Sequence, residues 1–172
     1  CNLVLILHDG KILAADRTPL SSGHFALLCR QTAEALRSRG LARNDRIAIV
    51  LPNGPDMAVA FLGVAACAAC APLNPAYGAS EFRFYLDDTR ARAVIVRKGE
   101  DGPVRSVAEE MGLAVVEIEV DASAPAGRFR MLPASIKCAT NPSFSAGGDV
   151  ALVLHTSGTT SRPKLVALSH AD

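Results

Sequence analysis

The most informative part of this sequence is the stretch Val150-Ala-Leu-Val-Leu-His-Thr-Ser-Gly-Thr-Thr-Ser-Arg-Pro-Lys164. Its first five residues are apolar and predict a buried strand. The hydroxyl residues around Gly158 predict a loop whose backbone N–H groups and hydroxyls turn toward one anion. Lys164 then adds a cation, so we expect this loop to hold a polyphosphate.

Two other phosphate-binding loops are excluded by the same residues. A Walker loop requires a Gly directly before its Lys and a Ser or Thr directly after it. Pro163 and Leu165 occupy those places here, and proline has no N–H to give a phosphate. The G-x-G-x-x-G pattern of dinucleotide-binding folds is also missing.

The run Thr156-Ser-Gly-Thr-Thr-Ser-Arg-Pro-Lys164, followed by Leu168-Ser-His170, resembles the phosphate-loop motif of adenylate-forming enzymes. This superfamily includes acyl-CoA synthetases, luciferases and the adenylation domains of peptide synthetases. Asp45-Arg-Ile-Ala-Ile-Val-Leu-Pro-Asn53 and Ala71-Pro-Leu-Asn-Pro-Ala-Tyr77 resemble the N-terminal subdomain of the same enzymes. Within the superfamily, the motifs are most similar to the oxalate- and small-acid-CoA ligase branch.

The resemblance implies an ATP-dependent acid–CoA ligase, which forms an acyl-adenylate and then a thioester. ATP and CoA are the co-substrates that it implies, with Mg²⁺ bound by a residue outside this sequence. Residues 1–172 then correspond to a partial N-terminal AMP-binding domain that ends just after the motif, and we expect them to be inactive alone. Two alternatives stay open: a non-catalytic truncated remnant, and an adenylation domain that loads a carrier protein.

The resemblance also assigns roles inside the loop. We expect a cradle for the β- and γ-phosphates of ATP, with a lysine that pairs with phosphate: Thr156, Ser157, Gly158, Thr159, Thr160 and Lys164. The alternative is that the hydroxyls only satisfy the backbone of the turn and that the lysine is a solvated surface group. No catalytic residue and no metal ligand is expected in this chain.

Two neighbouring positions, His155 and Arg162, allow two interpretations each, and His170 is given one role. His155 either contacts substrate or fixes the loop, or it is a satisfied histidine at a strand end. Arg162 contacts phosphate or lies exposed, and His170 orients the strand after the loop. Leu165 replaces a Gly that is usual in the superfamily: a positive φ there would strain Leu by roughly 1–2 kcal/mol, whereas an ordinary strand position would accept it.

The rest of the chain alternates strands with helices, which predicts an α/β fold with a mostly parallel sheet flanked by helices. Strands are expected over residues 3–7, 11–13, 46–51, 93–96, 113–120 and 150–154. Helices are expected over 23–38 and 56–69, from Ser80, and over 104–111. Residues 121–148 are rich in Ala, Ser, Pro and Gly and predict a surface connection.

The composition bears on which classes of partner the protein binds and on where it is located. With 18 basic and 17 acidic residues, no broad field for nucleic acid or membrane is expected. Leu3–Leu7 is too short for a membrane span. The five cysteines lack a disulfide framework, and we interpret Cys67-Ala-Ala-Cys70 as buried small residues, so an intracellular, cytoplasmic protein is expected. The resemblance implies a small carboxylic acid as its substrate. The identity of the acid and the oligomeric state stay open.

Overall fold

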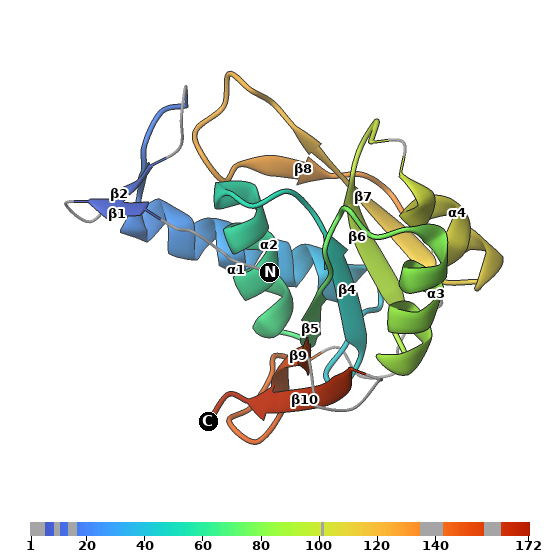
Figure 1. The fold of residues 1–172 in the computed structure, drawn as a ribbon. Helices are drawn as coiled ribbons and strands as arrows, with labels where there is room; N and C mark the ends of the chain where they lie inside the picture. The colour runs from blue at the N-terminus through green and yellow to red at the C-terminus, as the bar shows by residue number, and fades with distance from the viewer. Residues whose placement is uncertain (1–5, 9–10, 14–16, 101, 135–142, 157–162) are drawn as a thin grey trace.

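The computed structural model describes residues 6–8, 11–13, 17–100, 102–134, 143–156 and 163–172 (Figure 1). Its helices are α1 (Ser22–Ser38), α2 (Pro55–Ala65), α3 (Ala79–Asp88) and α4 (Pro103–Glu110). Its strands are β1 (Ile6–His8), β2 (Lys11–Leu13), β3 (Leu20–Ser21), β4 (Arg46–Val50), β5 (Ala69–Pro72), β6 (Ala93–Arg97), β7 (Ala114–Val120), β8 (Phe129–Met131), β9 (Val150–Thr156) and β10 (Lys164–Ser169).

The main sheet has the strand order β10-β9-β5-β4-β6-β7-β8. The five inner strands run parallel to one another, while β10 and β8 are antiparallel edge strands. This confirms the predicted α/β fold with a mostly parallel sheet. A separate small sheet is formed by β1, β2 and β3 near the N-terminus.

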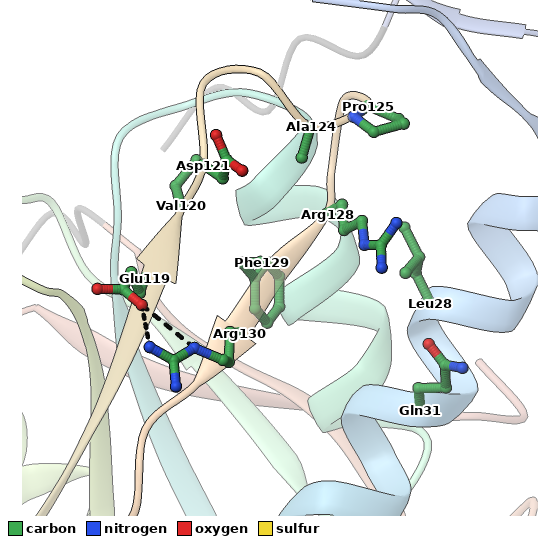
Figure 2. Close-up of a pocket in the computed structure, with 10 residues that line it drawn as sticks. All are labelled: Leu28, Gln31, Glu119, Val120, Asp121, Ala124, Pro125, Arg128, Phe129 and Arg130. Atoms are coloured by element: carbon green, nitrogen blue, oxygen red, sulfur yellow. Dashed lines mark hydrogen bonds and ion pairs between the residues drawn. The ribbon is translucent and has the colours of Figure 1, made fainter.

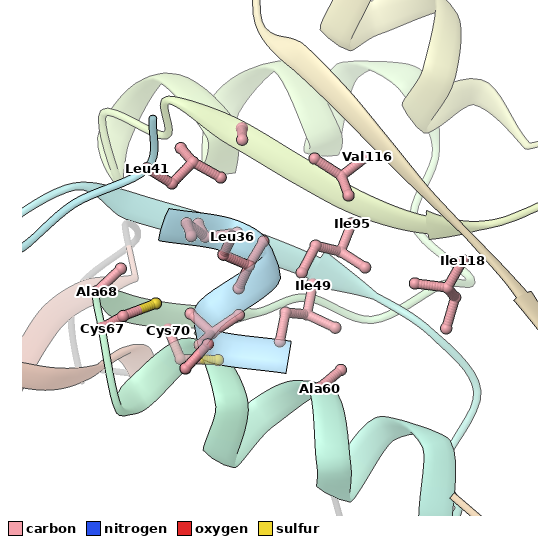
Figure 3. Packing of buried hydrophobic residues seen from close by; sticks show 14 of the residues in the cluster. Leu36, Leu41, Ile49, Ala60, Cys67, Ala68, Cys70, Ile95, Val116 and Ile118 are labelled. Carbon is pink, nitrogen blue, oxygen red and sulfur yellow. The ribbon is translucent and has the colours of Figure 1, made fainter. Parts of the chain in front are cut away.

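Helices cover both faces of the main sheet because its inner strands are apolar on both sides. On one face, α1 and α2 pack on alternate residues of the strands, such as Ile49 and Ile95 (Figure 3). On the other face, α3 and α4 cover the intervening residues, such as Val50 and Val94. The core therefore lies in two layers, one on each side of β4 and β6.

A glycine follows the C-terminal end of α1. Gly40 has a φ of 86°, and its N–H donates to Arg37 O at 2.9 Å while the N–H of Leu41 donates to Leu36 O at 3.2 Å. These two bonds satisfy carbonyls that the helix leaves open. The start of α1 is capped by Ser21, whose hydroxyl accepts from the His24 N–H at 3.3 Å.

The predicted helix over 56–69 was wrong at its C-terminal end. The helix α2 stops at Ala65, and residues 69–72 form β5, an interior strand between β4 and β9. Ala and Cys have little strand preference of their own, so the local sequence gave no strand signal. The strand forms because β4 offers a parallel partner, which pairs Ile47 with Cys70.

The stretch 121–148 contains more structure than a plain connection. Phe129–Met131 forms β8 and pairs antiparallel with β7, so this part of the chain adds an edge strand. Ala126 is fully buried, and its N–H donates to Thr18 O at 3.0 Å. The segment is therefore partly integrated into the fold, while residues 135–142 lie outside the described residues.

Candidate functional site

The two ends of the predicted phosphate loop lie opposite each other. β9 and β10 form an antiparallel hairpin in which Thr156 pairs with Lys164 and His155 pairs with Leu165. The Thr156 hydroxyl donates to Lys164 O at 3.3 Å. Both side chains at this mouth are exposed. Ser157, Gly158, Thr159, Thr160 and Arg162 lie outside the described residues.

His155 lies one residue before this mouth and is almost buried, with 8% of its side chain exposed. Its Nε2 lies 2.8 Å from Asp88 Oδ2, a carboxylate in the last turn of α3. The edge of the imidazole also meets the ring of Tyr85, with 4.7 Å between ring centroids. The structure thus supplies His155 with a polar partner and an aromatic wall, both from α3.

Tyr85 connects His155 to a second aromatic residue. It stacks on Tyr77 with 4.8 Å between centroids and an interplanar angle of 17°. Burial raises the pKa of Tyr77 to about 12, and hydrogen bonding with Tyr85 adds to the shift. A neutral phenol is therefore retained here across the physiological pH range.

Sequence reasoning missed Asp88 and Tyr85 as neighbours of the loop. Both lie on a helix that precedes His155 by almost seventy positions, and nothing in their spacing marks them. The general rule places ligands beyond the carboxyl ends of parallel strands. β9 is parallel to β5, and its carboxyl end lies beside the last turn of α3. The residue after that turn, Thr89, accepts a hydrogen bond at its carbonyl from the Arg46 side chain at the start of β4.

Leu165 lies in β10, and this position decides whether its backbone is strained. The non-glycine residues with positive φ in the described chain are Asn44 and Arg90, so Leu165 has ordinary strand geometry. Its side chain packs on a small cluster of Ala69, Ala71 and Val153. Leu165 therefore contributes apolar contact between β10 and β5 without backbone strain.

The other end of the hairpin is fixed by polar contacts. His170 Nε2 lies 2.9 Å from Ala65 O at the end of α2, and its N–H donates to Asp149 O at 3.1 Å. Asp149 in turn pairs with Arg43 and accepts from the Ala146 N–H. This ion pair lowers the pKa of Asp149. His170 thus orients the start and end of the hairpin, away from its mouth.

Cys67 and Cys70 are buried members of the main core, as predicted (Figure 3). Burial raises the pKa of the Cys67 thiol to about 12 and that of Cys70 still further. Thiols held protonated in this way are poor metal ligands and poor nucleophiles. Among the described residues, no group of three or more His, Cys, Asp and Glu side chains could hold a metal ion.

A groove of about 940 Å³ lies at the far edge of the sheet from β9 and β10 (Figure 2). It runs between α1 and the β7–β8 pair and is lined by Gln31, Arg128 and Phe129, among others. Its acidic residue Glu119 is already paired with Lys98 and Arg130, which lower the pKa of its carboxyl to about 2. The groove does not include any residue of the predicted phosphate site. Within the described residues, no helix is both long and apolar enough to cross a membrane.

Comparison with known proteins agrees with this fold. The profile of the AMP-binding enzyme family matches residues 8–172. The chain is 37% identical to an oxalate–CoA ligase of Saccharomyces cerevisiae, over 87% of this chain and 32% of that protein. It is 34% identical to the probable CoA ligase CCL9 of Humulus lupulus, over 94% and 31% of the two chains.

Solved structures show the same architecture. ATP-bound MatB from Rhodopseudomonas palustris superposes with a TM-score of 0.69 at 26% identity, covering 91% of this chain and 31% of that one. This chain spans about a third of the length of the relatives it matches. Because the family profile covers nearly all of the sequence, the chain belongs to the AMP-binding enzymes.

Proposed function

We propose that this chain is the ATP-binding N-terminal portion of a ligase that joins a small carboxylic acid to CoA. In the first step, a carboxylate oxygen attacks the α-phosphorus of ATP, the bond to the β-phosphate oxygen breaks, and pyrophosphate leaves. In the second step, the CoA thiolate attacks the acyl carbonyl, and AMP leaves as the thioester forms. The names of the relatives, an oxalate–CoA ligase and a probable CoA ligase, support this chemistry.

The observation that carries the proposal is the pairing of Thr156 with Lys164 at the mouth of the β9–β10 hairpin. It brings the first hydroxyl and the lysine of the motif to the same place. We assign the phosphate cradle to Thr156, Ser157, Gly158, Thr159, Thr160 and Lys164. Hydrogen-bond donors and a cation held in position offset the charge that grows on the leaving pyrophosphate.

Lys164 acts in this scheme as a compact point charge on the β- or γ-phosphate. It is exposed at the first residue of β10, so it reaches an anion at the hairpin mouth without burial. Magnesium, when bound, neutralises the triphosphate. We place its protein ligand and the CoA contacts in the part of the ligase that follows this chain.

The test is a comparison of two lysines in the full-length ligase. Lys164→Ala should raise the KM for ATP by roughly ten- to a hundredfold and leave the KM for the acid nearly unchanged, since it removes a contact to phosphate. Lys98→Ala is the matched control, because Lys98 lies on β6's C-terminal side and pairs with Glu119 at the distant edge. Equal KM values for ATP in both variants would contradict the proposal.

A second candidate is an adenylation domain that transfers the acyl group to a carrier protein. It is favoured by 30% identity over 96% of this chain to N-(5-amino-5-carboxypentanoyl)-L-cysteinyl-D-valine synthase of Penicillium rubens. Both candidates share the first step and differ in the thiol that accepts the acyl group. Supplying CoA or a phosphopantetheinylated carrier protein to the acyl-adenylate, and measuring AMP release, distinguishes them.

A further inference from the structure

We propose that Asp88 is a positioning residue for the phosphate site: through His155 it fixes the end of β9 at which Thr156 faces Lys164. The inference rests on the proposed function. It assigns to a residue outside the motif the task of holding in place the residues that would bind phosphate. Asp88 lies in the last turn of α3, far from the loop in sequence.

The contact is built to hold the imidazole in one orientation. Its Nε2 donates to Asp88 Oδ2 at 2.8 Å, and its edge lies against the ring of Tyr85. The His155 side chain is 8% exposed, whereas that of Asp88 is 42% exposed. A nearly buried ring with one polar partner has few other orientations, so the carboxylate decides where the histidine sits.

This link is placed where β9 leaves the sheet. β9 pairs with β5 at Leu152 and Cys70, so residues 154–156 extend beyond that pair. Past that point the described neighbours of the strand are β10, through the His155–Leu165 and Thr156–Lys164 pairs, and α3, through Asp88 and Tyr85. Because β10 is paired with β9 as one hairpin, we infer that α3 ties the hairpin mouth to the body of the protein.

A purely electrostatic role for Asp88 would change the KM for ATP in the opposite direction, so the direction of the change tests the inference. Asp88 is a partly exposed carboxylate near a site that binds an anion, so a purely electrostatic role would weaken ATP binding in the native protein. Removing its charge would then lower the KM for ATP. A positioning role predicts that removing the side chain raises the KM for ATP, because a phosphate-binding group displaced by about 1 Å loses much of its effect.

The experiment uses three substitutions in the full-length ligase, with ATP-dependent and acid-dependent kinetics and thermal unfolding measured for each. Asp88→Ala should raise the KM for ATP roughly tenfold while the KM for the acid changes less than about twofold. Asp88→Asn keeps an acceptor oxygen for His155 and should restore most of the lost affinity. Asp87→Ala, at the adjacent exposed carboxylate, is the control and should behave like the native enzyme.

A double substitution shows whether Asp88 acts through the histidine. In a His155→Gln background, Asp88→Ala should have little further effect on the KM for ATP, because the pathway is already interrupted. The inference is overturned if Asp88→Ala lowers or preserves the KM for ATP, if Asp88→Asn is as impaired as Asp88→Ala, or if both KM values rise together with a loss of thermal stability. Lys164→Ala separates the two claims: if it also leaves the KM for ATP unchanged, the proposed phosphate site itself is wrong.

Discussion

Gly63 of α2 lies directly against Thr32 of α1. A Cβ atom at position 63 would lie 2.5 Å from both Cβ and Cγ2 of Thr32 and 3.1 Å from Cys29 O. Such distances are too short for any side chain, so the two helices approach as closely as they do because residue 63 has none. Gly63 therefore allows α2 to pack closely against α1.

Gly63→Ala is expected to destabilise the protein by about 1–3 kcal/mol, the usual cost of overpacking a close contact. The helix preference of Ala over Gly recovers only up to about 1 kcal/mol, so the loss dominates. Gly23→Ala in α1 is the control, since a Cβ there meets nothing within 4 Å. Urea unfolding of both variants measures the difference, and equal stability would show that α1 and α2 separate without cost.

Arg17 connects three separate parts of the chain. Its guanidinium pairs with both Asp56 carboxylate oxygens at 2.8 and 2.9 Å and donates to the carbonyls of Ala124, Pro125 and Arg128. Only 11% of its side chain is exposed. Removing it leaves a partly buried carboxylate and several carbonyls without their donor.

Arg17→Ala is therefore expected to lower the free energy of unfolding by about 1–3 kcal/mol. The matched control is Arg30→Ala, which breaks an exposed pair with Glu34 one helical turn away. Such surface pairs contribute only about 0.5 kcal/mol. Chemical denaturation of the two variants tests the contrast, and similar losses would mean that the Arg17 contacts have no special weight.

The Arg43–Asp149 pair predicts a dependence of stability on pH. The hydrogen bond from Arg43, together with the Ala146 N–H, holds the pKa of Asp149 below its ordinary value of 3.8. A carboxyl with a lowered folded-state pKa stabilises the protein above its unfolded-state pKa and loses that effect as the pH falls through the folded-state value. The pair should therefore stabilise the protein at neutral pH and lose its effect in acid.

Asp149→Asn should accordingly be less stable than the native protein at pH 7, with a difference that shrinks as the pH falls below about 4. Unfolding curves at several pH values provide the measurement. Asp87→Asn, at an exposed position on α3, controls for the general effect of removing one negative charge. A difference that stays constant or grows in acid would contradict the assignment.

Residues 1–172 alone are expected to show no acid-dependent release of pyrophosphate, whereas the full-length ligase should release it. The physical reason is that we place the magnesium ligand and the CoA contacts, which the proposed scheme requires, in the part of the ligase that follows this chain. A coupled pyrophosphate assay on both proteins provides the measurement. Turnover by residues 1–172 alone would contradict this and show that the rest of the ligase is not needed to form the acyl-adenylate.

Local sequence predicted the elements that carry their own signals. The helix α1 shows apolar spacing and is followed by Gly40, and the β-branched run of β4 is apolar on both faces. The hydroxyl-rich motif placed a loop after β9, and the structure puts a strand on each side of it. For α1 and β4, the residues that form the element also carry its signal, so the local sequence was enough to predict them.

The strand β5 and the contact between Asp88 and His155 were decided only by the tertiary structure. Ala69 and Cys70 are compatible with a helix or a strand, and the open edge of β4 makes them a strand. Asp88 meets His155 because β9 extends past β5 toward α3, which no spacing along the chain encodes. The sequence by itself determined the α/β alternation, because this depends on residue type and short-range period. Packing alone determined which residues of α3 contact the end of β9, since contacts between distant segments exist only once the sheet has assembled.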